Sequence, residues 1–440
     1  MNLAFVDPGP SKLAFYLSLR SYLAPHVRCF YFSHHSDIRK LIRAAGSEVY
    51  PLPGSTPPAP FDIDDEALRT AIGGKELFLR EQQALASARQ LLADIDAFLD
   101  ACDADALLVW NGSDLQLSLA IYLARQRGLP VLFMEHGYLP GTVQLDLQGV
   151  NYFSSITQAV QAGKAQLDFS RDVDTALDHA IAGFKAGRPT RTVDPRLKPQ
   201  LQTNPLARSY QRCRLTIKQA YRRRLWREGR ALGLDSSAPL PERFILVPMQ
   251  VGKDSQLILH SPLVGNDPWR LLRLVQEAVR ATDPRLRIVA KLHPREKLPV
   301  QRRNLKLLRD FPDVRFMSDV SMRDLLARAA AVVTINSTAG FEAFFYDKPV
   351  ITLGRNFYTS PDLVEVVQAE DELIGALQRA LVNPVPSKRR RAFLRYVYAR
   401  CFVQSSYDDC SERSLRAAAR RIRELLSTAR PSRLSEAIVA

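Results

Sequence analysis

The chain has 440 residues, 46% of them hydrophobic and 24% charged, so it can bury a full core, and the disordered and fibrous classes are excluded. Its formal net charge of +15 comes from two segments, 208–227 and 388–440, which contribute +8 each, while the rest of the chain is close to neutral. Basic segments of this kind are typical of proteins that bind nucleic acid, an anionic membrane surface or an acidic substrate.

Short apolar runs alternate with helix-length amphipathic stretches through the first half of the chain. Strands are predicted at Asn2–Val6, Val27–Ser33, Glu48–Leu52, Ala106–Trp110 and Pro130–Glu135, and helices over 11–23, 36–45, 64–100 and 114–127. Continuous apolar strands that are each followed by a helix indicate a parallel sheet covered on both faces. The first half is therefore expected to be Rossmann-like.

The alternation stops between 188 and 241, where proline, arginine, glutamine and serine predominate. We interpret this stretch as a linker that carries a basic helix over 206–232. The pattern then resumes, with strands at Arg243–Gln250, Arg287–His293, Val314–Met317, Ala331–Ile335 and Pro349–Leu353 and helices over 266–281, 321–329, 337–347 and 361–381. After Pro386 two basic helices are predicted, over 388–404 and 411–427.

This order of elements predicts an α/β, GT-B-like fold class. In it, two Rossmann-like doubly wound domains face each other across a cleft, and the C-terminal helices pack back. The expected parts are an N-terminal domain over 1–190, a basic linker over 191–240, a C-terminal domain over 241–385 and basic helices over 386–440. Epimerases and other enzymes share such halves, so the fold does not settle the function.

Cysteine usage and hydropathy indicate the compartment. Five scattered cysteines without a CxxC pair, and no signal peptide, predict a protein of the reducing cytoplasm. No stretch approaches the ~18 to 20 apolar residues of a membrane span, so membrane contact is expected to be peripheral. None of the seven histidines has zinc-site spacing, and no metal is predicted.

Several nucleotide-binding motifs are missing from this sequence. There is no GxGxxG after the first strand of either half and no GxxxxGK[ST], which argues against dinucleotide oxidoreduction and P-loop chemistry. The triplets Asp62-Ile63-Asp64 and Asp103-Ala104-Asp105 do not lie at the carboxyl end of a strand. We interpret them as solvated turn acids, so a metal-bound nucleotide sugar is not indicated.

The most informative motif follows the predicted strand Ala331–Ile335. Asn336, Ser337 and Thr338 come directly after it, then Gly340 and the start of a helix. This pattern directs hydroxyls and free backbone N–H groups toward an anion at the carboxyl end of the strand. Glu342 is placed to accept hydrogen bonds from ribose hydroxyls. The alternative is that Ser337 and Thr338 are only helix caps.

Two further strand ends of the same domain carry polar residues. Lys291 and His293 end one strand and could balance the charge of a leaving phosphate, although a histidine in that position is more often structural. The first strand of the domain is followed by Gln250, Asp254 and Ser255. Because parallel strands end at the same edge of a sheet, the three strand ends are expected to converge.

In the first domain, Glu135 and His136 follow the last clear strand, and Asp146 lies downstream. An acid and a histidine at a strand end suit general-base or nucleophilic catalysis. The structural alternative is that they cap a helix and hold a loop.

These same segments resemble the KpsS/LipB family of bacterial capsule polysaccharide biosynthesis proteins. The resemblance rests on four ordered motifs, FMEHGYLP with LDLQGVN (133–151), VPMQVGKDSQLILHSP (247–262), KLHP (291–294) and VVTINSTAGFEA with DKPVITLGRNFY (332–358). They cover about half of the chain. The first 100 residues do not follow the family's glycine-rich start.

The resemblance implies a GT-B glycosyltransferase that transfers Kdo from CMP-Kdo, with retention, to a phosphatidylglycerol-type lipid or a growing Kdo linker. Carried over by position, His293 with Pro294 and Ser337 with Thr338 would hold the CMP phosphate, and Glu342 the ribose. The motif set is also similar to that of bacterial CMP-sialic acid transferases.

The resemblance also assigns the residues of transfer. Glu135 would supply the cleft acid, and Asp146 falls where related Kdo transferases place a proposed nucleophile. His136 stands where the family has a second acid, which leaves the division of labour among these three residues open. Our hypothesis is a metal-independent, retaining β-Kdo transferase in which Asp146 attacks the anomeric carbon and Glu135 or His136 takes the acceptor proton.

Two alternatives stay open. One is a transferase that uses CMP-sialic acid or another nucleotide sugar, and the other is a non-enzymatic export or nucleic-acid-binding component. Clustered motifs at strand ends argue against the second, and no RNA-binding signature is present, so nucleic acid is not an expected partner.

The basic segments lie outside the predicted donor motifs, so we assign them to docking on anionic lipid. The expected contacts are Arg222, Arg223, Arg224 and Trp226, and the structural alternative is a solvated basic face. This places the protein in the cytoplasm, peripherally on the inner face of the membrane.

Overall fold

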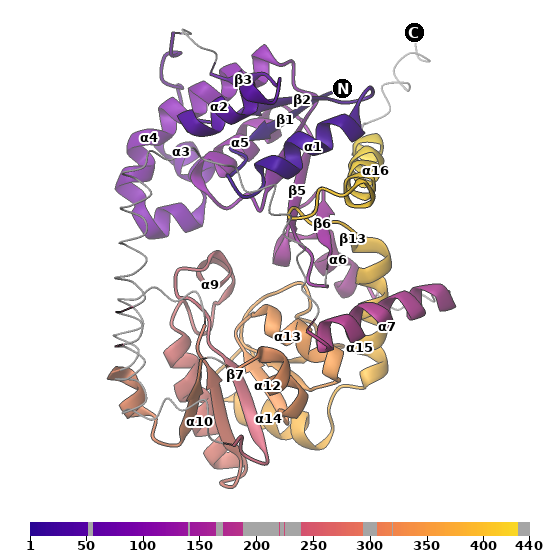
Figure 1. Ribbon diagram of the computed structural model, residues 1–440. Coiled ribbons are helices and arrows are strands. Elements are labelled where there is room, and N and C mark those ends of the chain that lie inside the picture. The colour runs from indigo at the N-terminus through magenta and orange to yellow at the C-terminus, as the bar shows by residue number, and fades with distance from the viewer. Residues whose placement is uncertain are drawn as a thin grey trace, which may run out of the picture. The chain divides into compact units, whose positions relative to one another are not determined.

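A computed structural model describes residues 1–51, 56–139, 141–163, 170–187, 220, 224, 239–293, 306–318 and 320–429 (Figure 1). The chain forms two compact units. Unit 1 contains Met1–Ala162 and the described residues 170–187 and 395–429, and unit 2 contains the described residues from 239 to Leu394. The basic helix predicted over 206–232 lies outside the described residues apart from Ala220 and Arg224.

Unit 1 is built on one sheet with strand order β13-β6-β5-β4-β1-β2-β3. Its strands are β1 (Asn2–Val6), β2 (Arg28–Phe32), β3 (Val49–Tyr50), β4 (Ala106–Trp110), β5 (Val131–His136), β6 (Val143–Asp146) and β13 (Phe402–Val403). Strands β1 to β5 are parallel to one another, as predicted.

The expectation of a purely parallel sheet is wrong at one edge, where β6 and β13 run antiparallel to their neighbours. The chain reverses between β5 and β6 too quickly for a crossover, so the two strands form a hairpin. Gly137 closes it, because its N–H donates to Thr142 O at 2.9 Å and a Cβ at this position would overlap the Thr142 side chain.

Helices cover both faces of the sheet of unit 1 (Figure 1). They are α1 (Leu13–Leu23), α2 (Ser36–Ala44), α3 (Asp65–Ile72), α4 (Gly74–Ala101), α5 (Leu115–Gln126) and α16 (Glu412–Ala429). Unit 1 also contains α6 (Ser155–Gln161) and α7 (Arg171–Lys185). The single helix predicted over 64–100 is wrong, because Gly73, at a φ of 80°, ends α3 and starts α4. The C-terminal helix α16 packs back beside α1, as predicted, and buries Leu415, Ile422 and Leu426 in the same core.

Unit 2 has a six-stranded sheet with order β12-β11-β10-β7-β8-β9, in which every pair is parallel. Its strands are β7 (Phe244–Pro248), β8 (Arg287–Lys291), β9 (Val314–Met317), β10 (Ala331–Thr334), β11 (Val350–Thr352) and β12 (Glu365–Val366), and its helices include α9 (Ser255–His260), α10 (Pro268–Thr282), α12 (Met322–Arg328), α13 (Thr338–Ala343), α14 (Glu372–Val382) and α15 (Ser387–Tyr396). In the described part of the chain no helix combines the length and hydropathy needed to cross a bilayer.

Two predicted helices of the second half are wrong in extent. The helix expected over 361–381 begins only at Glu372, since the chain first forms the edge strand β12. The helix expected over 388–404 ends at Tyr396, continues as a π-helical turn over Val397–Cys401 and then becomes β13. Pairing with β6 therefore overrides helical propensity at residues 402–403.

Both sheets are doubly wound, which confirms the predicted fold class of the two halves. The chain leaves the first strand in one direction and later returns to its other side, so a switch point lies between β1 and β4 in unit 1 and between β7 and β10 in unit 2. In open α/β sheets ligands bind outside the carboxyl ends of the strands at such points.

Candidate functional site

The switch point of unit 2 is closed by an amide network. Gln250, after β7, donates from Nε2 to Asn336 Oδ1 at 2.9 Å, and the Asn336 backbone N–H donates to Gln250 Oε1 at 3.2 Å. Asn336 is 2% exposed, and its Nδ2 donates to Gln256 O at 2.8 Å. The structure thus brings together the loops that follow β7 and β10, as predicted, but these two amides hold the loops to each other.

Ser337 and Thr338 begin the short helix α13. Ser337 Oγ accepts a hydrogen bond from Ala339 N at 3.2 Å, so its capping role is confirmed, while Thr338 is exposed. The Tyr358 hydroxyl donates to Ser337 O, and a Cβ at Gly340 would overlap that hydroxyl. Since α13 has only six residues, a phosphate here would depend on individual hydroxyl and N–H donors.

Glu342 is a half-buried carboxyl group one turn into α13. Burial raises its pKa to about 7, and the positive charge of Arg323 lowers it in part. Among the described residues nothing donates a hydrogen bond to this carboxyl group. A carboxyl group with a pKa near neutrality beside a strand end is able to accept hydrogen bonds from a ligand.

Among the other residues of unit 2 that were predicted to bind the donor nucleotide, Lys291 and Asp254 make structural contacts. Lys291 is buried, and its Nζ donates to Ser318 O at 2.8 Å, so it joins the ends of β8 and β9. The Asp254 carboxylate accepts from Gln256 N at 2.8 Å and caps α9, whose first residue is Ser255. His293 is half-buried after β8. Pro294 lies outside the described residues.

Glu135 lies at the carboxyl end of β5 in unit 1. Its carboxylate accepts hydrogen bonds from Asn111 Nδ2 and, at 2.8 Å, from His136 N. Asn111 has a φ of 64° and Gly112 a φ of 84°, and a Cβ at Gly112 would lie 2.7 Å from Ile121 Cδ1. This left-handed turn after β4 aims the Asn111 amide at Glu135, and an Asn-Gly pair after a strand is the sequence signal that could have identified it.

His136 belongs to a group of aromatic rings that the sequence did not predict. Its ring centroid lies 5.1 Å from that of Trp110 and 4.8 Å from that of Tyr407, and Trp110 and Tyr407 are 5.2 Å apart. The Lys12 ammonium lies 4.7 Å from the centroid of the Trp110 ring. We call Lys12, Trp110, His136 and Tyr407 the ring cluster.

Asp146 is the last residue of β6 and is 5% exposed. Its Oδ1 accepts from Gln148 N at 2.8 Å and Gly149 N at 3.4 Å. Its Oδ2 accepts from Ser155 N at 3.0 Å and Ser155 Oγ at 2.6 Å. The carboxylate therefore organises its own loop and the start of α6.

Two of the acids in the DxD triplets have structural roles, in agreement with our interpretation of them as turn acids. Asp64 caps α3 by accepting from Ala67 N at 2.8 Å, and Asp105 accepts from Asn2 N at 2.8 Å. The described ranges contain no group of three His, Cys, Asp or Glu side chains that could hold a metal ion. Of the predicted membrane contacts Arg224 is exposed, whereas Arg222, Arg223 and Trp226 lie outside the described residues.

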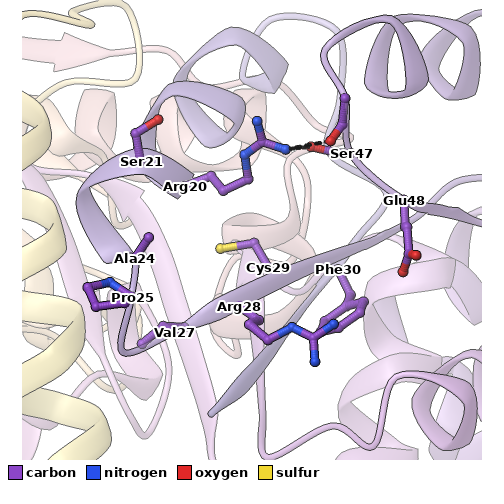
Figure 2. Close-up of a pocket in the computed structure, with 11 residues that line it drawn as sticks. Arg20, Ser21, Ala24, Pro25, Val27, Arg28, Cys29, Phe30, Ser47 and Glu48 are labelled. Atoms are coloured by element: carbon purple, nitrogen blue, oxygen red, sulfur yellow. Dashed lines mark hydrogen bonds between the residues drawn. The ribbon is translucent and has the colours of Figure 1, made fainter.

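A surface pocket of about 530 Å³ lies at the opposite, amino-terminal end of β2 (Figure 2). Arg20 reaches across it and donates to Gly46 O at 2.9 Å and Ser47 Oγ at 2.5 Å. Burial raises the pKa of the Cys29 thiol on its wall to about 12. No predicted site residue lines this pocket, so it is not the candidate site.

Comparison with known proteins shows the following relationships. Residues 199–404 match the family model described as capsule polysaccharide biosynthesis protein. The protein FixF of Sinorhizobium fredii is 29% identical over 325 residues, which cover 73% of this chain and 66% of FixF. The capsule polysaccharide export protein KpsS of Escherichia coli is 27% identical and the match covers 53% of this chain and 63% of KpsS.

The capsule polysaccharide modification protein LipB of Neisseria meningitidis is 26% identical, over 28% of this chain and 30% of LipB. The chain thus spans no more than about two thirds of the length of these relatives. Among solved structures, the β-Kdo 2,7 transferase KpsC of Thermosulfurimonas dismutans aligns with a TM-score of 0.41 and 18% identity, over 76% of this chain and 89% of that one. The UDP-GlcNAc 2-epimerase of Methanocaldococcus jannaschii aligns with a TM-score of 0.35 and 12% identity, over 90% and 99%.

Proposed function

We propose that this chain, whose residues 199–404 match the family model of capsule polysaccharide biosynthesis proteins, is a glycosyltransferase of surface polysaccharide synthesis. The proposed reaction transfers Kdo from CMP-Kdo, with retention, to a lipid or lipid-linked Kdo acceptor. The observation that carries the proposal is the Glu342 carboxyl group, which has no hydrogen-bond donor among the described residues and follows the Ser337-Thr338 pair at the switch point of unit 2.

The proposed donor site takes a nucleotide through two kinds of contact. Glu342 accepts hydrogen bonds from the ribose hydroxyls, and the hydroxyls of Ser337 and Thr338, with His293, donate to the phosphate. Hydrogen bonds from ribose favour the ionised form of Glu342, so nucleotide binding near neutral pH is expected to release a proton. Cationic and N–H donors would take the place of a divalent metal in stabilising CMP as it leaves.

The proposed transfer chemistry uses carboxylates of unit 1. Double displacement needs a carboxylate that attacks the anomeric carbon, and we propose Asp146 for this role. Four hydrogen bonds fix the orientation of the Asp146 carboxylate. At least one of them has to break before a carboxylate oxygen can attack the anomeric carbon. Glu135, held by Asn111, or His136 would accept the proton of the acceptor hydroxyl.

The test is a transfer assay with CMP-Kdo, CMP-sialic acid and UDP-sugars, each with phosphatidylglycerol-type and Kdo-terminated lipid acceptors. We expect release of CMP from CMP-Kdo alone, a product whose mass increases by one Kdo, and no loss of activity with chelator. The Asp146→Asn variant should lose transfer and keep CMP binding. Full activity of this variant would exclude Asp146 as nucleophile.

Two alternatives are distinguished by the same assay. Turnover of CMP-sialic acid or a UDP-sugar in place of CMP-Kdo would indicate a different transferase of acidic glycans. Failure to release nucleotide from any donor would favour a non-enzymatic role. The observation that favours this second candidate is the name of the Escherichia coli relative, which is an export protein.

A further inference from the structure

The ring cluster lies at the switch point of unit 1. Lys12 follows β1 and precedes α1, Trp110 is the last residue of β4, and β1 and β4 are the two strands between which the chain changes direction. His136 ends the neighbouring strand β5. The cluster therefore occupies the place in an α/β sheet where ligands bind, and the proposed donor site does not use it.

The cluster is assembled from segments that are far apart in the sequence. The rings of Trp110 and His136 are inclined at 77°, those of Trp110 and Tyr407 at 80°, and all three rings and Lys12 are partly exposed. The Lys12 ammonium lies 5.7 Å from the Tyr407 ring centroid as well as 4.7 Å from that of Trp110. The Lys12 ammonium group and the three aromatic rings therefore lie together in one small patch.

The residues just before Tyr407 are held by backbone and side-chain contacts. The strand β13 pairs with β6. Just after β13, Ser406 N donates to the buried hydroxyl of Ser414 at 3.2 Å, and Ser405 Oγ lies 2.9 Å from the same hydroxyl. These contacts bring the residues before α16 back to the carboxyl end of the sheet. The backbone that leads to Tyr407 is therefore tied to the sheet and to the start of α16.

We propose that the ring cluster binds the acceptor and that it takes a sugar carrying a carboxylate. Aromatic faces pack against the C–H groups of a sugar ring, and an ammonium group binds a carboxylate. Glu135, held next to His136, would lie beside a hydroxyl of the bound sugar. The inference rests on the proposed function, because it names the acceptor class for that reaction.

The test measures binding in the full-length protein, so it does not depend on turnover. Calorimetric titration with the methyl glycoside of Kdo is compared with methyl glucoside and with glycerol 3-phosphate. We expect the wild type to bind the Kdo glycoside at least 10-fold more tightly than either of the others. Lys12→Met should weaken that binding about 10-fold, equivalent to about 1.4 kcal/mol, and abolish the preference for the acid.

The ring contribution is tested separately. Tyr407→Ala should weaken binding of the Kdo glycoside at least 5-fold, while Tyr407→Phe, which keeps the ring, should stay within twofold of the wild type. The exposed residues Lys388 and Phe78 lie outside the cluster, and Lys388→Met and Phe78→Ala serve as matched controls. Unchanged thermal unfolding of each variant, and unchanged CMP binding, show that the fold and the donor site are intact.

Three results would overturn the inference. These are equal affinities of wild type, Lys12→Met and Tyr407→Ala for the Kdo glycoside, equally tight binding of glycerol 3-phosphate, and no binding of the glycoside at millimolar concentration. If instead the variants lose binding but the wild type transfers nothing from CMP-Kdo, the proposed donor reaction fails and the acidic-sugar site stands.

Discussion

At the scale of single residues, Glu342 is the group whose chemistry depends most on its surroundings. Its carboxyl group is half-buried, has no donor among the described residues and follows a strand end at a switch point. A group placed in this way lowers the stability of the ligand-free protein when it ionises, and a ligand that donates hydrogen bonds offsets that cost. Two predictions follow from this for the same substitution.

The first concerns stability. The pKa of Glu342 is about 7 in the folded protein against 4.5 for an ordinary glutamate, so the folded state holds the proton more tightly. The tighter proton binding stabilises the folded state. This contribution to the free energy of unfolding is fully present below pH 4.5 and is lost as the pH rises through 7. Glu342→Gln should therefore be more stable than the wild type by ~1 to 3 kcal/mol at pH 8 and similar to it at pH 4.5.

Chemical denaturation at the two pH values measures this difference. Glu277→Gln, at an exposed position of α10, is the matched control and should show no pH-dependent gain. A gain for Glu342→Gln that is equal at both pH values would contradict the assigned titration.

The second prediction concerns nucleotide binding. Glutamine in place of Glu342 keeps an acceptor oxygen but loses the charge that strengthens hydrogen bonds from ribose. We expect the affinity for CMP at pH 8 to fall by about 10-fold in calorimetry. The affinity for deoxy-CMP, which lacks one ribose hydroxyl, should change less. Equal losses for both nucleotides would argue against ribose as the partner of Glu342.

The third residue-scale prediction concerns Asn111. Its amide orients Glu135, so we treat it as a positioning residue. Asn111→Gly fits the φ of 64° without strain and removes only the amide, and we expect kcat to fall by about 10- to 100-fold with little change in CMP affinity. Asn111→Ala should show the same loss of kcat and also lose about 1 kcal/mol of stability, because a Cβ is strained at this backbone angle. Normal kcat in Asn111→Gly would remove Asn111 from the mechanism.

Whether a site residue could be predicted from the sequence depended on how far apart in the sequence it and its contacts lie. Ser337 and Glu342 were predictable because a strand, a polar pair and a helix follow one another within a few residues, and this local order survives in the structure. Lys12, Trp110 and Tyr407 were not, because their contacts join segments up to several hundred residues apart and no local pattern marks them. Asp146 was chosen by resemblance, and its four hydrogen bonds were not foreseen.

At the scale of elements, the strands buried on both faces were predicted best. The bounds of β1, β4 and β9 agree with the expected ones. Strands β1 and β4 are neighbours in the sheet and are mostly apolar, as covered parallel strands are, whereas the edge strand β9 includes the half-buried Arg315. Strands β6 and β13 were not predicted, because they are short and pair with each other although they lie far apart in the sequence. The predicted helices that failed did so where glycine or an edge strand interrupts the pattern, at Gly73 and at β12.

The helix α13 offers a prediction at this scale. Its Gly340 lies against Tyr358, whose hydroxyl donates to Ser337 O and so ties the helix start to the segment after β11. Gly340→Ala should cost about 1 to 3 kcal/mol of stability and weaken CMP binding, because the new methyl group displaces that hydroxyl. Adding Tyr358→Phe removes the displaced oxygen and should recover part of the stability.

Gly375 provides the matched control for this substitution. It lies within α14, where the nearest atom to an added Cβ is the end of the flexible Arg379 side chain at 3.3 Å. Gly375→Ala should therefore stabilise the protein by about 0.5 to 1 kcal/mol, as expected for glycine in a helix. Thermal unfolding and CMP titration of the three variants check the prediction. A stable Gly340→Ala variant with normal CMP affinity would show that α13 tolerates the shift.

At the scale of the whole molecule, the charge of +15 is unevenly distributed, and α16 displays part of it. The apolar face of α16 is buried in the core beside α1. Arg413, Arg416 and Arg420 are exposed, and Arg416 is paired with Glu412 at 2.6 Å. Since no apolar face of α16 is left to insert into a bilayer, attraction to a membrane through this helix would be electrostatic.

That mechanism predicts binding to vesicles containing phosphatidylglycerol, none to neutral phosphatidylcholine vesicles, and release as salt rises from about 0.1 to 0.5 M, where screening shortens the range of the charges. Each basic residue at the surface contributes on the order of 1 kcal/mol, so changing Arg413, Arg416 and Arg420 together to glutamine should weaken flotation with the vesicles about 100-fold or more. The same change at Arg222, Arg223 and Arg224 tests the segment 208–227 independently. If both triple variants bind as the wild type does, or if salt has no effect, the basic segments do not dock this protein on anionic lipid, and an acidic glycan or a protein partner would have to explain their charge.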